Sequence, residues 1–516
     1  GDVYRGAGTL TLNKCMYDSK TGTITDNNPV SGNPTFANAG SDDYRLKFGS
    51  TGIDVGDNSY VSGWSYDLAE NARTTNSTVD LGAYEYLCTT PAAGTVSSDA
   101  TICYNTTTTM TVSGYTGQYF KWQYSDDSGS SWTDIASSNV SSYTTPAILA
   151  TRQYRTSASC NDVSYVNSTA VTQTINRTTY YVNDGSTTGD VHSNAAFDGS
   201  GNGTIGDPFG TLADALAVVS CGDIIYVDAG TYTEENLNIA NNTDDVSIIG
   251  AGNDKTIFDG DNTDDWVTFA AGGNTVNVTI TDMTVKEYGG TSSQAGGCVR
   301  VLGGTGIVFQ DMIFHSNQTT GYNDGAVMYA ENASSVEFDR CIFHNNDGSD
   351  DASVCYWNSS GTLTMKNCLV YENDAVDEFD IYLYTGTGNF TNCTFVDNED
   401  CNYGTLGSRG TTTVNNCIFD GNGTAGDVYR GAGTLTLNKC MYDSKTGTIT
   451  DNNPVSGDPT FTNAGSDDYT LFSSSDGVDD GDNSYVSGWS YDLAENARIS
   501  NTTVDLGCYE ATSCSE

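Results

Sequence analysis

Residues 307–314 read IVFQDMIF, and residues 336–343 read VEFDRCIF. The same pattern recurs in VTITDMTV (278–285), LTMKNCLV (363–370), NFTNCTFV (389–396), TVNNCIFD (413–420) and LTLNKCMY (435–442). Each run has the length of a strand, and a polar stretch rich in Asn, Asp and Gly follows it. Such runs, separated by turn residues and without a helical pattern between them, predict an all-β fold.

Two apolar series mark the repeat. The first series is Met283, Met312, Cys341, Cys368, Cys393, Cys417 and Cys440, with intervals of 29, 29, 27, 25, 24 and 23 residues. The second stands two places further on, at Val285, Phe314, Phe343, Val370, Phe395, Phe419 and Tyr442. Residues two apart in a strand point to the same face, so both series are expected to stack on their counterparts in neighbouring coils. A strand that recurs at this period predicts a solenoid.

A second apolar run lies between these anchors. It appears as CVRV (298–301), AVMY (326–329), VCYW (354–357) and IYLY (381–384). Each coil therefore has at least two strands, and three are favoured.

The cysteines of the first series invite an interpretation as a metal or redox site. Zinc ligands cluster as C-x-x-C pairs, whereas these cysteines recur once per coil. Buried small thiols at such a spacing are ordinary core residues, and we expect that role here.

Residues 179–239 contain a strand, a loop rich in Gly and Asp, and a short helix. Pro208 and Thr211 precede the helix, and four apolar residues follow at helical spacing: Leu212, Ala215, Leu216 and Val219. With the repeat, this stretch resembles the right-handed parallel β-helix (pectin-lyase-like) proteins of bacterial surfaces, found with Ig-like modules in large secreted adhesin-like proteins of Bacteroidota. The resemblance covers residues 179–510 and implies that the helix caps the N-terminal end of the solenoid.

The chain repeats itself over a long segment. Residues 1–85 and 426–510 carry the same residue at all but 13 positions, and in both the sequence resembles the closing segment of large β-helix proteins. We therefore interpret residues 1–86 as the C-terminal part of a preceding β-helix unit. Arg73 with Asp80 and Glu85, repeated as Arg498 with Asp505 and Glu510, predicts an ion pair that closes the solenoid end.

Residues 87–175 have a different pattern, with short alternating strands at the spacing of a β-sandwich. The stretch from Lys121 to Ser125 resembles Ig-like modules of secreted proteins, which implies that Trp122 is a core residue. The same resemblance makes Cys103–Cys160 the candidate disulfide, although Cys88 is also available and sequence does not fix the pairing. The predicted domains are thus 1–86, 87–175, a capped β-helix at 176–512, and the start of a further Ig-like module at 513–516.

The composition limits the partners. Lys and Arg number 20 against 66 Asp and Glu, which gives a formal net charge of -46. Such a surface repels nucleic acid and anionic membranes and suits cations. No apolar run is long enough to span a bilayer.

Acidic residues raise the question of chemistry. β-Helix lyases and hydrolases need convergent acids, but the acids here are scattered through turns, and only Asn262-Thr263-Asp264 is similar to a hydrolase motif. We therefore expect no enzymatic activity and no catalytic residues. The alternating oxygen-bearing residues Asp198, Ser200 and Asn202, with Asp207 close behind, suggest a calcium loop, and Ca²⁺ is the one cofactor to consider.

These observations favour a structural role: an extracellular, non-enzymatic fibre or giant adhesin at the cell surface, built as a tandem array of a 425-residue unit. Its partners would be copies of itself, with glycans or other cell surfaces as further candidates. The alternative is a surface protein that binds or degrades polysaccharides. Its glycan surface would include Tyr329, Trp357, Tyr382 and Tyr384.

Overall fold

The computed structural model describes residues 2–47, 49–74, 77–88, 90–117, 119–136, 141–160, 163–239, 244–269, 277–289, 296–304, 306–321, 323–376, 378–398, 402–423 and 426–511. The chain divides into two compact units, residues 1–175 and 176–516. The predicted module start at 513–516 lies outside the described residues.

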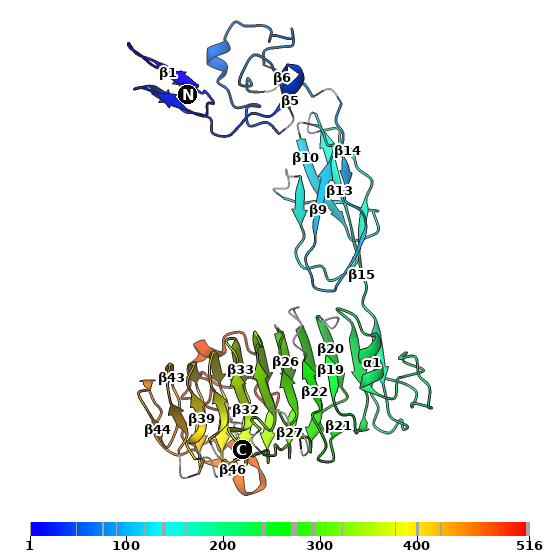
Figure 1. The fold of residues 1–516 in the computed structure, drawn as a ribbon, viewed down its shortest axis with the longest axis vertical. Coiled ribbons are helices and arrows are strands. Elements are labelled where there is room, and N and C mark those ends of the chain that lie inside the picture. Colours follow the sequence, from blue (N-terminus) through cyan, green and yellow to red (C-terminus); the bar gives the residue numbers. More distant parts are fainter. Residues whose placement is uncertain are drawn as a thin grey trace. The chain divides into compact units, whose positions relative to one another are not determined.

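The second unit is a parallel β-helix of three long sheets (Figure 1). The first sheet contains, in order, β16 (Thr179–Val182), β17 (Ile224–Val227), β20 (Val246–Gly250), β23 (Asn277–Thr281), β26 (Gly306–Gln310), β29 (Ser335–Asp339), β33 (Thr362–Lys366), β37 (Thr387–Thr391), β40 (Thr411–Asn415), β43 (Thr434–Asn438) and β45 (Thr450–Asn452). The second contains β18 (Gly230–Tyr232), β21 (Thr256–Asp259), β24 (Thr284–Lys286), β27 (Ile313–His315), β30 (Ile342–His344), β34 (Leu369–Tyr371), β38 (Thr394–Val396) and β41 (Ile418–Asp420). The third contains β19 (Leu237–Ile239), β22 (Val267–Phe269), β25 (Val299–Val301), β28 (Met328–Glu331), β32 (Ala352–Asn358), β36 (Phe379–Leu383), β39 (Gly404–Ser408), β42 (Val428–Arg430) and β44 (Lys445–Thr446).

Each complete coil therefore has three strands. The favoured number is confirmed, but the division of the repeat differs from the prediction. IVFQDMIF is two strands, β26 and β27, and the chain bends between them at Asp311, whose φ is 54°. The equivalent residue of every repeat has positive φ: Asp282, Arg340, Asn367, Asn392, Asn416 and Lys439. Such a left-handed residue ends one strand and turns the chain into the next sheet.

The core lies between the three sheets. Phe314, Phe343 and Val370 are in register from strand to strand and are fully buried, as the stacking predicts. The anchor residues stand at the corner after each bend and are also buried. Burial raises the pKa of the Cys368 and Cys393 thiols well above the usual value, so these cysteines are core residues.

Helix α1 (Leu212–Val218) lies where the sequence predicts a helix. Thr211 is its N-cap and accepts a hydrogen bond from the Asp214 N–H. Leu212 and Ala215 are buried in the same core as the first coils. Glu234 accepts hydrogen bonds from the first two N–H groups of α1, at 2.7 and 2.8 Å, which ties the helix to the chain after β18.

After β44 and β45 the chain leaves the coils and runs along the outside of the second sheet. This flank segment (residues 454–511) contains β46 (Phe461–Asn463), the 3₁₀ helices η3 (Ala464–Ser466) and η4 (Asn483–Val486), and β47 (Asp468–Leu471). It covers the outward side chains of β34, β38 and β41: Leu369, Tyr371, Val396 and Ile418. A short parallel pair, β31 (Asp347–Gly348) and β35 (Asp374–Ala375), lies elsewhere on the coils.

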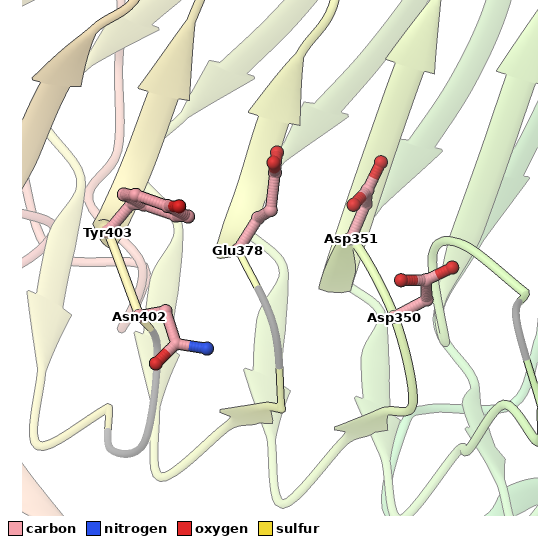
Figure 2. A pocket seen from close by; sticks show the side chains of 5 residues that line it. All are labelled: Asp350, Asp351, Glu378, Asn402 and Tyr403. Atoms are coloured by element: carbon pink, nitrogen blue, oxygen red, sulfur yellow. The ribbon is translucent and has the colours of Figure 1, made fainter.

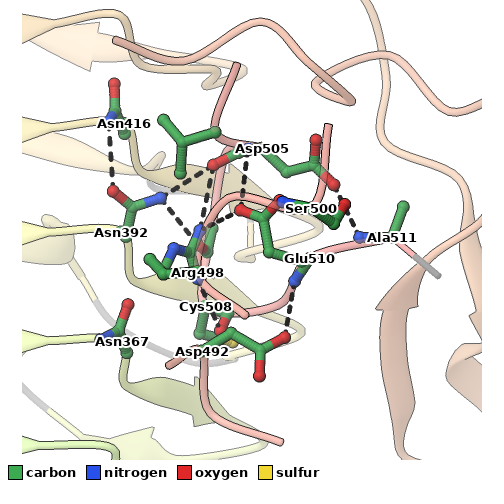
Figure 3. Close-up of polar contacts among 12 residues, drawn as sticks. Asn367, Asn392, Asn416, Asp492, Arg498, Ser500, Asp505, Cys508, Glu510 and Ala511 are labelled. Carbon is green, nitrogen blue, oxygen red and sulfur yellow. Dashed lines mark hydrogen bonds and ion pairs between the residues drawn. The ribbon is translucent and has the colours of Figure 1, made fainter. Parts of the chain in front are cut away.

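The repeated ion pair lies within the flank segment. The Arg498 guanidinium is 3.2 Å from the Glu510 carboxylate and fully buried, and it also donates to the Asp505, Gly507 and Cys508 carbonyls (Figure 3). Arg498 therefore stabilises the flank segment, which packs along the outside of the second sheet. The sequence predicted an ion pair that closes the end of the solenoid.

Within the first unit, residues 87–175 form two sheets around one core. One has β11 (Thr133–Asp134), β10 (Tyr119–Ser125), β13 (Arg152–Ser159), β15 (Val171–Ile175) and β8 (Ala100–Ile102), with β14 (Val166–Asn167) on β13; the other has β12 (Ser142–Thr144), β9 (Thr109–Ser113) and β7 (Thr95–Val96). Trp122 is buried between them, as expected. Whether the module belongs to the Ig-like class stays a prediction.

The predicted Cys103–Cys160 pairing is wrong. Cys160 is bonded to Cys88, and their Cα atoms are 5.4 Å apart, within the range of protein disulfides. Cys103 is disulfide-bonded as well, to another partner. Cys88 precedes the module's first strand, and sequence spacing gave no way to see that the chain returns beside it.

Residues 2–86 fold as short elements: β1 (Val3–Tyr4), β2 (Thr11–Asn13), β3 (Lys20–Thr21), β4 (Thr25–Asn27), β5 (Phe36–Asn38), η1 (Ala39–Ser41), β6 (Asp43–Leu46) and η2 (Asn58–Val61). Among the described residues of either unit, no helix has the length and apolar character needed to cross a membrane.

Candidate functional site

A column of aromatic side chains runs across the outer face of the third sheet. The register places Arg300, Tyr329, Tyr356, Tyr382, Gly407 and Tyr429 side by side on successive strands. The Tyr329 and Tyr356 rings are parallel, with centroids 5.7 Å apart. Because their inward neighbours belong to the core column, strand alternation sends these rings outward.

The column is interrupted at Gly407, and Phe379 fills the space. A Cβ at position 407 would lie within 2.6 Å of Phe379 ring atoms, so glycine is required there by close packing. The Phe379 ring is 4.8 Å from Tyr382 and 5.5 Å from Tyr429. The result is a continuous aromatic row over five coils.

The predicted glycan residues fall on both sides of the sheet. Tyr329 and Tyr382 belong to the outer row, but Tyr382 is only 4% exposed and Tyr329 is partly buried, because neighbouring rings cover them. Tyr384 lies beside the row with 44% of its surface exposed. Trp357 is wrong as a surface residue, because it is fully buried in the core. It stands two residues after Cys355, which faces inward, so alternation gives Trp357 the same direction.

Acidic residues gather where the strands of the third sheet begin. Asp350 and Asp351 precede β32, Glu378 precedes β36, and Asn402 and Tyr403 precede β39, and together they line a pocket (Figure 2). Parallel stacking brings the starts of these strands to the same edge, although pocket residues of neighbouring coils are 24 to 28 residues apart in the chain. This pocket was not found from the sequence, because its acids come from turns of different coils.

Asp324, which lies shortly before β28, adds a third carboxylate. One oxygen each of Asp324, Asp350 and Asp351 lies within 4.8 Å of the others. Burial, and then the Asp350 charge, raise the pKa of Asp324 to about 6. With a pKa of about 6, the Asp324 carboxyl is a proton donor at mildly acidic pH, and the Asp350 and Asp351 carboxyl groups lie beside it.

The acidic group and the aromatic row adjoin one another. Tyr403 lines the pocket, and its ring centroid is 6.0 Å from that of Phe379. Burial, and then the Glu378 charge, raise the pKa of Tyr382 to about 12. A cation also lies on this face of the third sheet. The Arg409 guanidinium is 5.3 Å from the Tyr384 ring centroid.

Three convergent carboxylates are also a donor set that hard cations prefer. The calcium loop predicted from the sequence is a different group of residues, at 198–207. There, Asp198 accepts from the Ser200 N–H, Asn202 accepts from the Thr204 N–H, and the Asp207 carbonyl accepts from Asn202 and Gly203. Calcium binding by Asp198, Ser200, Asn202 and Asp207 stays a prediction.

Two family models and one curated protein are similar to parts of this chain. The model of the right-handed β-helix region matches residues 268–441, and that of a domain of unknown function matches residues 92–177. A curated relative, a probable pectinesterase/pectinesterase inhibitor of Arabidopsis thaliana, is 29% identical over 157 residues. The alignment covers 28% of this chain and 25% of the relative, so the chain spans about a quarter of that protein's length. No solved structure gives a match.

These findings correct the functional expectation. The non-enzymatic fibre or adhesin is wrong as the main interpretation, because the similarity is to a pectinesterase and to a β-helix family typical of polysaccharide-degrading enzymes. The same similarity points against the expected lack of enzymatic activity. The protein contains a parallel β-helix, and its relatives favour the alternative that the sequence also allowed.

Proposed function

We propose that the protein acts on polysaccharides outside the cell, as a secreted or cell-wall-associated β-helix protein that degrades them. The sugar chain would lie across the third sheet, on the ring faces of Tyr384 and Tyr403, with the reacting bond at the acidic pocket. The observation that carries this proposal is the group of Asp324, Asp350 and Asp351 beside the aromatic row.

The roles follow from the electrostatics. Asp324, with its raised pKa, is the proton donor to a leaving oxygen. Asp350, on the neighbouring coil, is the carboxylate that activates water or attacks directly. Aromatic faces bind the apolar faces of sugar rings, and the Arg409 guanidinium offers hydrogen bonds to ring substituents or a carboxylate.

The charge of the protein narrows the substrate. A chain with net charge -46 repels a fully ionised polyuronate, whereas a neutral or esterified polysaccharide carries little charge. We therefore propose a neutral or esterified polysaccharide as the substrate, with hydrolysis of an ester or of a glycosidic bond as the reaction.

The test is a hydrolysis assay with highly esterified pectin and a neutral glycan panel, recording both alcohol release and new reducing ends. We expect turnover by the native chain and a loss in kcat of roughly 100-fold or more for Asp350→Asn, the scale of general acid–base catalysis. Asp254→Asn, an exposed carboxylate on another coil, is the matched control and should leave kcat unchanged.

Alcohol release would identify an esterase, and reducing ends would identify a glycosidase. Binding without turnover would limit the proposal to the glycan-binding half. Neither binding nor turnover on the whole panel would refute it.

A further inference from the structure

The two copies of the repeated segment fold alike. β1–β3 and β2–β4 pair in parallel, as β42–β44 and β43–β45 do, and β5–β6 corresponds to β46–β47. The ion pair is also repeated, since Arg73 lies 3.1 Å from Glu85. The described part of residues 2–86 therefore has the same order of strand pairs as residues 427–511 have on the β-helix.

The copies differ in what covers them. Tyr469 is 1% exposed, and its equivalent Tyr44 is 52% exposed. Leu493 is partly buried against the flank, whereas Leu68 is 67% exposed. The core-facing Leu437 is fully buried, and its equivalent Leu12 is only half-buried. The first copy thus presents an apolar face that the second copy buries.

The surface that covers the second copy is well defined. Asn392 donates to the Asp505 carbonyl (Figure 3) and to the Gly507 carbonyl. Asn416 exchanges hydrogen bonds with the backbone of Asp482. The Tyr469 hydroxyl donates to Asp397, 3.1 Å away, and its ring contacts Tyr371. These side chains of the coils form the flank, together with the apolar residues Leu369, Val396 and Ile418.

The first copy retains the residues that this surface recognises. Asp482, Asp505 and Gly507 are matched by Asp57, Asp80 and Gly82, and Tyr469, Leu471, Leu493 and Leu506 by Tyr44, Leu46, Leu68 and Leu81. Cys508, whose thiol is 3.4 Å from the Thr394 hydroxyl, is replaced by the smaller Ala83. Val478, which packs in the same apolar cluster as Leu471 and Leu506, is replaced by Ile53, which is one methylene group larger. Arg45 and Lys47 stand in place of Thr470 and Phe472, so the first copy also carries two added positive charges next to the retained Tyr44 and Leu46.

We infer that residues 2–86 are a docking segment for the flank of the β-helix in a second copy of this chain, where they take the place of residues 427–511. The tethered segment 427–511 competes at an effective concentration of about millimolar, so it occupies its own flank in dilute solution. Docking in trans is favoured when that segment is displaced or when the protein is concentrated. This inference is independent of the proposed function.

The first experiment disables the tethered segment in the full-length chain. In Tyr469→Asp/Leu493→Asp, two side chains that contact the flank become charged, so the flank is free for the first copy of another molecule. We expect light scattering after size exclusion to change from one chain of 54.7 kDa to concentration-dependent multiples of it.

The control adds the matched changes Tyr44→Asp/Leu68→Asp, at side chains that are exposed in the first copy. This quadruple variant should remain monomeric. A monomeric double variant, or equal oligomers from both proteins, would overturn the inference.

The second experiment traps the contact without charged substitutions. The variant combines three substitutions: Ala83→Cys, Thr394→Cys and Cys508→Ala. It removes the thiol of the second copy, places one at the equivalent position of the first copy, and adds the thiol at position 394 with which that one would pair. Under oxidation at about millimolar protein, a dimer band should form on a non-reducing gel, and the variant that lacks Ala83→Cys should give none.

A disulfide between positions 83 and 394 of the same chain would contradict the second copy as the partner. Absence of any such link in the folded protein would contradict the docking segment.

Discussion

Asp324 links the acidic pocket to a measurable pH dependence. Folding raises its pKa from 3.8 to about 6. Between about pH 4 and pH 6 the Asp324 carboxyl is therefore protonated in the folded protein and ionised in the unfolded chain. This group therefore lowers stability as pH rises from 4 through 6. Asp324→Asn should raise the free energy of unfolding at pH 7 by about 1–3 kcal/mol and change it little at pH 3.

Urea unfolding at both pH values measures this, with Asp254→Asn as the control. An equal change at both pH values would show that Asp324 does not titrate as described.

Arg498 is the other residue with a large predicted effect. It is fully buried against Glu510, so Arg498→Met leaves an acid in a nonpolar site. We expect a loss of about 3–5 kcal/mol for the β-helix unit, as measured for broken buried ion pairs. Arg73→Met, in the first copy, should leave unfolding of that unit unchanged.

The measurement is chemical unfolding followed by hydrogen exchange of the coils. Similar losses from both variants would mean that the two units unfold together.

Residue-level expectations succeeded where strand alternation alone decides direction. The cysteines of the first series point into the core for that reason. Tyr382 lies on the opposite face but is only 4% exposed, and binding of a glycan by Tyr329 and Tyr382 stays a prediction. The surface prediction for Trp357 was wrong because it was based on the ability of tryptophan to bind sugars. Trp357 stands two residues after the inward-facing Cys355, and strand alternation therefore assigns it to the core.

At the scale of elements, the two copies of one strand offer a direct comparison. Cys440 follows β43 and is fully buried, while its equivalent Cys15 follows β2 and is half-buried. Brief alkylation of the native chain should modify Cys15 at least about tenfold faster than Cys440, because only the latter requires local opening. Peptide mass spectrometry resolves the two sites.

Equal rates would mean that the last coil is open in solution. Full protection of Cys15 at high protein concentration would agree with the docking segment described above.

The repeat predicted the coils but not their corners. Apolar spacing gives the stacking of strands, because equivalent residues must meet. The bend at Asp311 depends on one residue with positive φ, and Arg340 and Lys439 fill the same role without being typical turn residues. Local sequence therefore did not divide IVFQDMIF into two strands.

At the scale of the whole molecule, the large negative net charge is expected to lower the stability of the folded state. With 66 acidic and 20 basic residues, self-repulsion opposes the compact state. We expect Tm to rise by roughly 3–8 °C between 10 mM and 150 mM NaCl, because the Debye length falls from about 30 to about 8 Å. Calorimetry measures this, and matched sucrose is the control for effects other than screening.

A Tm that does not depend on salt would mean that bound counterions already neutralise the surface.

The sequence by itself determined the stacked architecture, the buried ladder, the helix at 212–218 and the repeated segment, because each depends on periodicity or on identity along the chain. Only the tertiary structure brought Asp324, Asp350 and Asp351 together, placed Phe379 over Gly407, and paired Cys88 with Cys160. These contacts join residues from different coils or distant strands, and their closeness is set by strand register and corner geometry. The acidic pocket, and with it the proposed polysaccharide chemistry, is a product of that register.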